Sequence, residues 1–213
     1  MPLEQANGVQ NRRVYETVKR VFDIVCSAVG MVLLSPLMAV LALVVHLDDP
    51  NVSCIFAQER VGKNETTFVM YKFRTMVADA EKQRALLECQ NEKDGAAFKI
   101  RNDPRVTRVG RVLRRFSLDE LPQLWNVFKG DMSLVGPRPA LPHEVAQYEP
   151  WQRERLLVKP GLTCYWQVIP RRDTVSFDKW MKMDVRYVRK RSWLLDLKLI
   201  VKTIRIVVTA QGQ

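Results

Sequence analysis

The chain has 213 residues, enough for one domain with a sizeable core, with or without appendages. It carries 34 lysines and arginines against 23 aspartates and glutamates, a formal net charge of +11, so we expect polyanionic partners: nucleic acid, anionic lipid or phosphorylated substrates. The four cysteines form no C-x-x-C pair and only two histidines could join them, which argues against a structural zinc site and favours a reducing compartment.

The N-terminal part predicts a leader followed by a membrane segment. Residues 1–18 begin with a polar stretch that lacks a long apolar core, which favours a loose leader over a secretory signal. Residues 24–47 contain no charged side chain and would reach ~36 Å as one helix at ~1.5 Å per residue, enough to span a bilayer core. We therefore predict a membrane helix within residues 19–50.

Two arrangements of this helix fit its sequence. Pro36 removes a backbone hydrogen bond at its centre and bends it, and Ser35 could satisfy the freed carbonyl. Prolines are common in membrane helices, so a kinked helix that crosses once is the commoner case. Basic residues on both flanks instead favour a helix that enters and returns to the cytoplasmic face: Arg12, Arg13, Lys19 and Arg20 before it, and Arg60, Lys63, Lys72 and Arg74 after it.

The next elements are short. Residues 55–62 and 68–76 alternate and predict two strands separated by a turn, and residues 77–92 are charged and helix-prone. Residues 99–115 form the most basic window, with apolar residues at helical spacing, and predict an amphipathic basic helix after Pro104. It could lie on anionic headgroups, bind a diphosphate or bind nucleic acid, and the sequence carries no nucleic-acid-binding signature beside it.

Residues 117–139 concentrate short-range polar chemistry. The adjacent carboxylates Asp119 and Glu120 repel each other, so beside basic residues such a pair usually shares a metal, a proton or a cationic complex. Asp131 follows a glycine, and Arg138 between two prolines is a fixed planar fork suited to phosphate. The same residues also fit a helix start, with Ser117 as the N-cap of a capping box or with Asp119 as the cap. The residues alone leave site and cap open.

The C-terminal part predicts further helices. Residues 143–157 predict a helix. Residues 158–163 predict a turn that leads into an extended segment ending near residue 169, and residues 171–173 predict a polar turn. Ser176 is expected to cap a helix through residue 188. Residues 192–210 predict an amphipathic helix that packs on the core or lies in a membrane interface.

In their order, these motifs make the chain resemble bacterial small monotopic phosphoglycosyl transferases, from Lys19 to the C-terminal helix. The resemblance rests on residues 19–23 (KRVFD), 35–36 (SP), 71–76 (YKFRTM), 117–123 (SLDELPQ), 129–139 (KGDMSLVGPRP) and 159–163 (KPGLT). It implies an α+β, mostly helical, monotopic membrane protein with short strands, amphipathic interfacial helices and an N-terminal re-entrant helix broken at Ser35 and Pro36. Residues 51–213 would form the catalytic domain on the cytoplasmic face of the bacterial plasma membrane.

The resemblance also implies a reaction. Such enzymes move a sugar 1-phosphate from a UDP-sugar to undecaprenyl phosphate, release UMP and start exopolysaccharide, capsule or glycoconjugate synthesis. Asp119 would be the nucleophile that forms an aspartyl-phosphosugar intermediate, and Glu120 would hold Mg²⁺. Membrane phospholipid, downstream glycosyltransferases and a second copy of the chain are further expected partners, and nucleic acid is not.

Other site residues follow by motif. Arg114 and Arg138 match basic residues that contact phosphates, Lys72 and Arg74 are expected to do the same, and Pro137 belongs to the substrate-binding loop. For Asp184 the role stays open between metal support and substrate binding, and a helix-face salt bridge is the alternative. Lys72 could equally be a surface charge.

The chain departs from the family at two places. Cys164 replaces the glycine of Pro-Gly-x-Thr-Gly, which makes that turn less permissive, and residues 168–172 lack the usual Gly-Arg in a region expected to influence sugar choice. Two other functions compete. One is a membrane-tethered basic module in which residues 99–115 bind lipid or nucleic acid, and the other is a metal-dependent glycosyltransferase that releases a nucleoside diphosphate.

Overall fold

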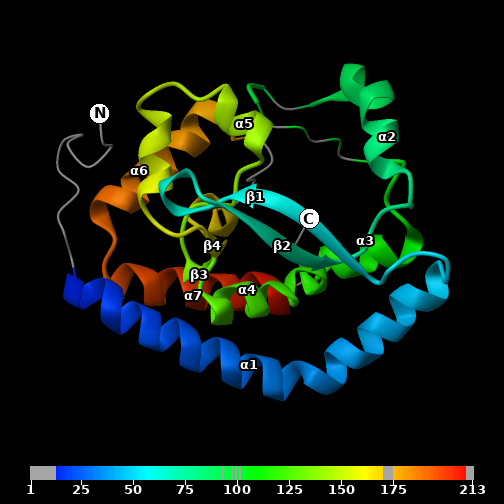
Figure 1. Ribbon diagram of the computed structural model, residues 1–213, viewed down its shortest axis with the longest axis horizontal. Coiled ribbons are helices and arrows are strands. Elements are labelled where there is room, and N and C mark those ends of the chain that lie inside the picture. The colour runs from blue at the N-terminus through cyan, green and yellow to red at the C-terminus, as the bar shows by residue number, and fades with distance from the viewer. Residues whose placement is uncertain are drawn as a thin grey trace.

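A long apolar helix, α1 (Arg13–Asp48), lies along one edge of the computed structural model, and all other elements lie on one side of it (Figure 1). The nearest layer contains three helices, α3 (Arg108–Arg115), α4 (Gln123–Lys129) and α7 (Trp193–Val208). The architecture is α+β and mostly helical, as predicted. The structure describes residues 13–92, 94–96, 98, 100, 102–169 and 175–209.

Helix α1 is the one helix of the described residues that is long and apolar enough to cross a membrane. It begins at Arg13, inside the range predicted as leader, and residues 1–12 lie outside the described part. Pro36 lies within it, and the Ser35 hydroxyl donates to the Val32 carbonyl at 2.8 Å, the carbonyl that Pro36 leaves without an amide donor. This bond confirms the role predicted for Ser35, and the helix bends about halfway along (Figure 1).

Polar side chains at the start of α1 attach it to the other elements. Lys19 donates to Asp196 of α7 at 2.7 Å. Arg20 donates to two carbonyls at the end of α4, those of Val127 and Phe128, each at 2.6 Å. The Asp23 carboxylate accepts from the backbone amide of Leu134 at 3.1 Å. The motif at residues 19–23 therefore docks the apolar helix.

Two small sheets carry the loops of the site. Strands β1 (Ile55–Val61) and β2 (Thr67–Phe73) pair antiparallel, as predicted, and β3 (Ser133–Val135) pairs parallel with β4 (Gly161–Thr163). Asn126 of α4 is fully buried and holds β2, because its side-chain amide donates to the Val69 carbonyl at 2.7 Å and its oxygen accepts from the Tyr71 amide at 3.1 Å.

The core lies beyond this layer. One cluster surrounds Trp166, Trp180 and Met181, and a second surrounds Val188 and Leu199. The cap predicted at Ser176 is confirmed, because its side chain accepts from the Lys179 amide at the start of α6 (Phe177–Lys190). The Ser192 side chain likewise accepts from the Leu195 amide at the start of α7.

Three predicted elements are shorter than expected. Residues 77–92 give a short α2 (Ala80–Arg84) and a 3-10 helix, η3 (Ala85–Gln90). The basic helix begins only at Arg108, because Thr107 caps it by accepting from the Gly110 amide at 2.9 Å. Residues 143–157 divide into α5 (Pro142–Ala146) and η5 (Gln152–Leu157), since Pro150 cannot continue a helix.

The extended segment predicted up to residue 169 is also shorter. It is strand β4 followed by η6 (Trp166–Val168), and the Cys164 side chain between them is buried. The polar turn at 171–173, the end of the sugar-choice region at 170–172 and the basic residues Lys99 and Arg101 lie outside the described part.

Candidate active site

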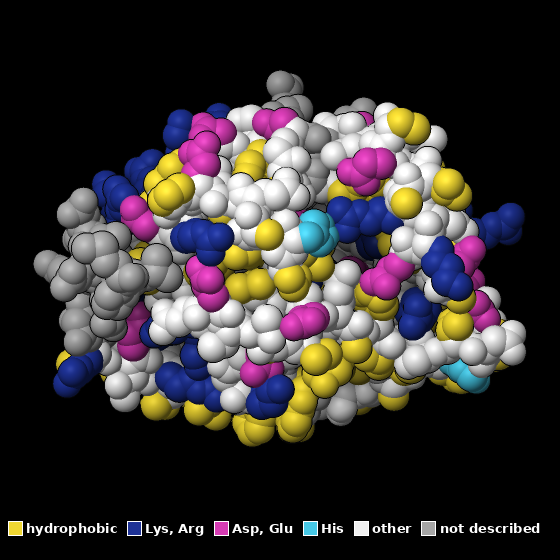
Figure 2. Space-filling model, turned by 45° about the horizontal axis from the view of Figure 1, so that its top comes forward, with side chains coloured by type: hydrophobic (Ala, Val, Ile, Leu, Met, Phe, Trp, Pro, Cys, Tyr) yellow, Lys and Arg dark blue, Asp and Glu magenta, His cyan; other side chains and the backbone are white. Residues whose placement is uncertain are grey.

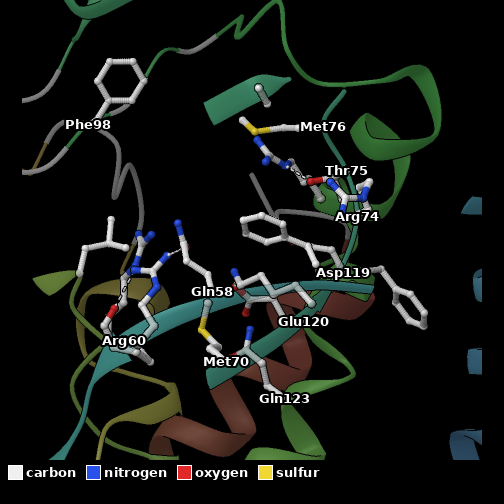
Figure 3. A pocket seen from close by; sticks show the side chains of 18 of the residues that line it. Gln58, Arg60, Met70, Arg74, Thr75, Met76, Phe98, Asp119, Glu120 and Gln123 are labelled. Atoms are coloured by element: carbon white, nitrogen blue, oxygen red, sulfur yellow. Dashed lines mark hydrogen bonds and ion pairs between the residues drawn. The ribbon is translucent and has the colours of Figure 1, made fainter. Parts of the chain in front are cut away.

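A cavity of about 860 Å³ lies between the β1–β2 hairpin, α3 and the loop before α5. Six residues predicted for the site line it: Lys72, Arg74, Arg114, Asp119, Glu120 and Arg138. Lys and Arg side chains occupy a hollow on this face of the molecule (Figure 2). Within the cavity, Arg60 and Gln58 lie on one side of Glu120, and Arg74 and Thr75 on the other (Figure 3).

The acid pair lies in a 3-10 turn, η4 (Leu118–Glu120), and not at a capped helix start. Ser117 has a left-handed backbone with φ of 55° and makes no side-chain cap bond, so the capping box is wrong. Asp119 as a cap is wrong too, because α4 follows Pro122 and has no side-chain cap bond. The Asp119 side chain is buried in the cavity wall and does not cap a helix.

The two carboxylates differ in environment. Glu120 accepts from the Lys72 ammonium at 2.9 Å and is partly exposed to the cavity. Asp119 is only 8% exposed, and burial raises its pKa above the usual range. Lys72 and Arg114 oppose that rise, whereas the charge of Glu120 adds to it. The result is a desolvated carboxylate between two cations, so Lys72 belongs to the site and is not an isolated surface charge.

Arg114 reaches the cavity because α3 approaches the end of β2 closely. A Cβ atom on Gly110 would lie 2.1 Å from the Thr75 carbonyl oxygen, so the contact requires glycine. The Arg114 Nε group donates to the Thr75 hydroxyl at 3.0 Å. The Arg74 Nε group donates to the Ser53 carbonyl at 2.8 Å. The Arg74 guanidinium lies over the Phe56 ring.

Two buried arginines hold the loop that carries Arg138. Arg155 donates to the Arg138 carbonyl at 2.7 Å, and Arg60 donates to the next carbonyl, that of Pro139, at 3.0 Å. The Arg138 guanidinium lies over the Trp180 ring, 5.8 Å from its centre. Pro137 does not line the cavity, but its carbonyl accepts from the Gly161 amide at 2.8 Å. Pro137 therefore shapes the loop.

Asp184 lies behind this loop and does not line the cavity. It is fully buried on α6 and forms an ion pair with Arg155 at 2.7 Å. Burial raises the pKa of Asp184 to about 6, against the opposing effect of Arg155. Asp184 thus forms a salt bridge, as the alternative predicted, but the pair is fully buried and its partner Arg155 lies on η5.

Asp131 is placed differently from the acid pair. It lies outside the cavity lining, pairs with Lys129 at 2.9 Å and accepts from the Asn126 amide at 3.1 Å. Its role is to hold the turn after α4.

The sequence did not assign Arg60, Gln123 or Trp180 to the site, yet all three side chains line the cavity. Gln123 is 3% exposed and follows the acid pair at the start of α4. The strand period could have found Arg60, since alternation places it on the same face as Gln58.

An apolar surface accompanies the site. Exposed apolar residues follow α1 for most of its length, and more lie on the neighbouring helices: Val112 and Phe116 at α3, Trp125 and Phe128 on α4, and Leu194, Leu197, Val201 and Ile204 on α7. Exposed apolar area on this scale marks an interaction surface, and its continuity with α1 favours lipid.

The family model and the relatives that match this chain all describe sugar transferases. A sequence model described as "Bacterial sugar transferase" matches residues 14–210. The galactosyl transferase CpsE of Streptococcus agalactiae is 40% identical over 194 residues, 91% of this chain and 43% of the relative. The undecaprenyl-phosphate galactose phosphotransferase of Salmonella typhimurium is 40% identical over 208 residues, 94% of this chain and 42% of the relative.

A third relative is closer in length. The exopolysaccharide production protein ExoY of Rhizobium meliloti is 40% identical over 201 residues, 91% of this chain and 87% of the relative. The chain thus spans less than half of the first two relatives and most of the third.

Proposed function

This chain belongs to the bacterial sugar transferase family, and we propose that it transfers a sugar 1-phosphate from a UDP-sugar to undecaprenyl phosphate and releases UMP. The observation that carries the proposal is the buried Asp119 carboxylate in a cavity that also holds Lys72, Arg114 and Arg138. Such a site suits a carboxylate nucleophile and a phosphorylated substrate. The names of relatives that act on undecaprenyl phosphate support the acceptor.

The reaction has two displacements at one phosphorus atom. An Asp119 oxygen attacks the sugar-side phosphorus, an oxygen–phosphorus bond forms, and the bond to the bridging oxygen breaks, so that UMP leaves with the electron pair. An oxygen of undecaprenyl phosphate then attacks the same phosphorus and releases the Asp119 carboxylate. Arg114, beside Asp119, would stabilise charge on the transferred phosphoryl oxygens.

The site fits Mg²⁺ as a cofactor. Mg²⁺ often takes one or two carboxylates together with substrate phosphates and water, and Glu120 is the partly exposed carboxylate of the cavity wall. Bound there, the ion would neutralise diphosphate charge. The described residues hold no cluster of three potential metal ligands, so the substrate would have to complete the coordination.

We propose further that α1 is re-entrant and places the site at the cytoplasmic face of the plasma membrane. Both halves of α1 contact the same domain: Lys19 pairs with Asp196, and Leu41 and Val45 pack with Phe73 and Leu113. A helix that crossed the bilayer could not keep both sets of contacts with a domain on one side. Labelling single cysteines placed at Val14 and Asp49 with an impermeant reagent in oriented vesicles tests this, because a crossing helix would expose them on opposite faces.

The reaction is tested with purified protein, undecaprenyl phosphate, Mg²⁺ and a panel of UDP-sugars. The proposal expects UMP release that disappears in Asp119→Asn and persists in Asp131→Asn, which changes an aspartate outside the cavity. The panel should include UDP-galactose and UDP-N-acetylgalactosamine, since relatives are named for these sugars. Release of UDP would support the glycosyltransferase alternative, and salt-sensitive DNA binding without turnover would support the binding module.

A further inference from the structure

Arg60 on β1 is a buried cation that lines the cavity. It is 7% exposed, and its two terminal nitrogens donate to neutral groups, the Pro139 carbonyl at 3.0 Å and the Gln58 side-chain oxygen at 2.6 Å. Its Nε group has no hydrogen-bond partner in the described part of the chain. Among the residues that the structure describes, no carboxylate forms an ion pair with it.

Other buried arginines of the chain differ in this respect. Arg155 pairs with Asp184 at 2.7 Å, and Arg105 pairs with Asp103 at 2.6 Å. A buried charge is costly unless it is paired, so the unpaired state of Arg60 needs a reason. A second cation increases the cost, because Arg138 lines the same cavity and its charge acts on Arg60 more strongly than the opposing charge of Glu144 or of Glu120.

Arg60 nevertheless stays charged at neutral pH. Burial, and then the neighbouring Arg138, lower the pKa of Arg60 to about 10. Two guanidinium groups that face one cavity form a site for an anion.

The two ends of the cavity carry different charge arrangements. Arg114 lies with Asp119, its strongest attractive partner. Arg60 lies on the other side of Glu120 from Thr75, which is the residue that Arg114 contacts (Figure 3). A diphosphate with its sugar-side phosphorus at Asp119 would therefore extend its second phosphate toward Arg60 and Arg138.

We propose that Arg60, together with Arg138, binds the nucleotide-side phosphate of the donor and holds the leaving nucleoside monophosphate. The inference rests on the proposed function. When the bond between the sugar-side phosphorus and the bridging oxygen breaks, the electron pair goes to that oxygen and the leaving phosphate gains negative charge. Guanidinium groups already in place beside it stabilise that charge without reorganisation and without a proton transfer.

A double-mutant cycle separates direct binding from support of the loop, because Arg60 also holds the Pro139 carbonyl. The affinity for UMP is measured by calorimetry for the wild type, Arg60→Gln, Arg138→Gln and the double variant, with uridine as the ligand without phosphate. Loss of a charge-assisted hydrogen bond should weaken UMP about 10- to 100-fold and leave uridine unchanged. Arg60→Gln should weaken UMP at least several-fold further in the Arg138→Gln background.

Two outcomes overturn the inference. One is no added loss in the Arg138→Gln background, which would make Arg60 a positioning residue for the loop. The other is an equal loss of affinity for UMP and for uridine.

Should Arg60→Gln not fold, Arg60→Lys replaces it in the same cycle, since it keeps a cation but loses the planar fork. Failure of the proposed function can be distinguished from failure of this inference. A wild type that binds UMP but releases none from any UDP-sugar refutes the transferase activity. Normal turnover with unchanged UMP affinity in Arg60→Gln refutes only the role of Arg60.

Discussion

Arg155 and Asp184 form a fully buried ion pair of 2.7 Å, and the same Arg155 nitrogen donates to the Arg138 carbonyl at 2.7 Å. The pair thus connects α6 to the loop that brings Arg138 to the cavity. Asp184 belongs to the support of the site and does not contact the cavity itself.

Removing the Asp184 charge should destabilise the protein strongly. Asp184→Asn leaves the buried Arg155 charge unpaired, which we expect to lower the free energy of unfolding by about 3–5 kcal/mol. The matched control is Asp178→Asn on the same helix, which breaks the exposed pair with Lys182 and should cost about 0.5 kcal/mol or less. Chemical denaturation in detergent measures both, and equal losses would contradict the structural role of Asp184.

The pH dependence of turnover should report Asp119. The nucleophile must be ionised, and burial raises its pKa, so activity should fall on acidification at a higher pH than an ordinary aspartate would give. Lys72 opposes that rise, hence Lys72→Met should move the acidic limb to still higher pH and lower the rate. Lys129→Met, which removes an exposed cation that pairs with Asp131, serves as the control. An acidic limb unmoved by Lys72→Met would argue against Asp119 as the titrating group.

Gly110 should be intolerant of a side chain. Its Cβ would lie 2.1 Å from the Thr75 carbonyl oxygen, so Gly110→Ala must displace α3 and with it the bond from Arg114 to Thr75. We expect a loss of about 1–3 kcal/mol in stability and a lower rate of UMP release. Gly30→Ala is the control, because its Cβ would lie 3.4 Å from a Leu124 methyl carbon, an ordinary contact. Retention of full activity in Gly110→Ala would contradict the close packing.

Asp196 should determine how firmly α1 is docked. It accepts hydrogen bonds from Tyr15 at 2.6 Å, Lys19 at 2.7 Å and Tyr187 at 2.8 Å. Asp196→Asn leaves the Lys19 ammonium without its buried partner, so amide exchange should increase at the start of α1 and in α7. Glu16→Gln is the milder comparison, because the pair with Arg191 is partly exposed. Unchanged protection of α1 in Asp196→Asn would show that apolar contacts alone hold the helix.

Features that depend on near neighbours in the chain could be predicted from the order of the residues. The uncharged run of α1, the strands of the hairpin and the serine cap of α6 follow from periodicity and capping, which act over a few residues. The motif order also located the acid pair and most of the cationic residues around it.

Which distant groups meet depends instead on how the whole chain packs. That packing buried Asp119 at the expense of a helix cap, gave Asp184 the partner Arg155, and left Arg60 at the cavity wall with no ion pair to a carboxylate of the described residues. Local pattern cannot supply these contacts, since the energy of a buried charge depends on which charges packing brings beside it.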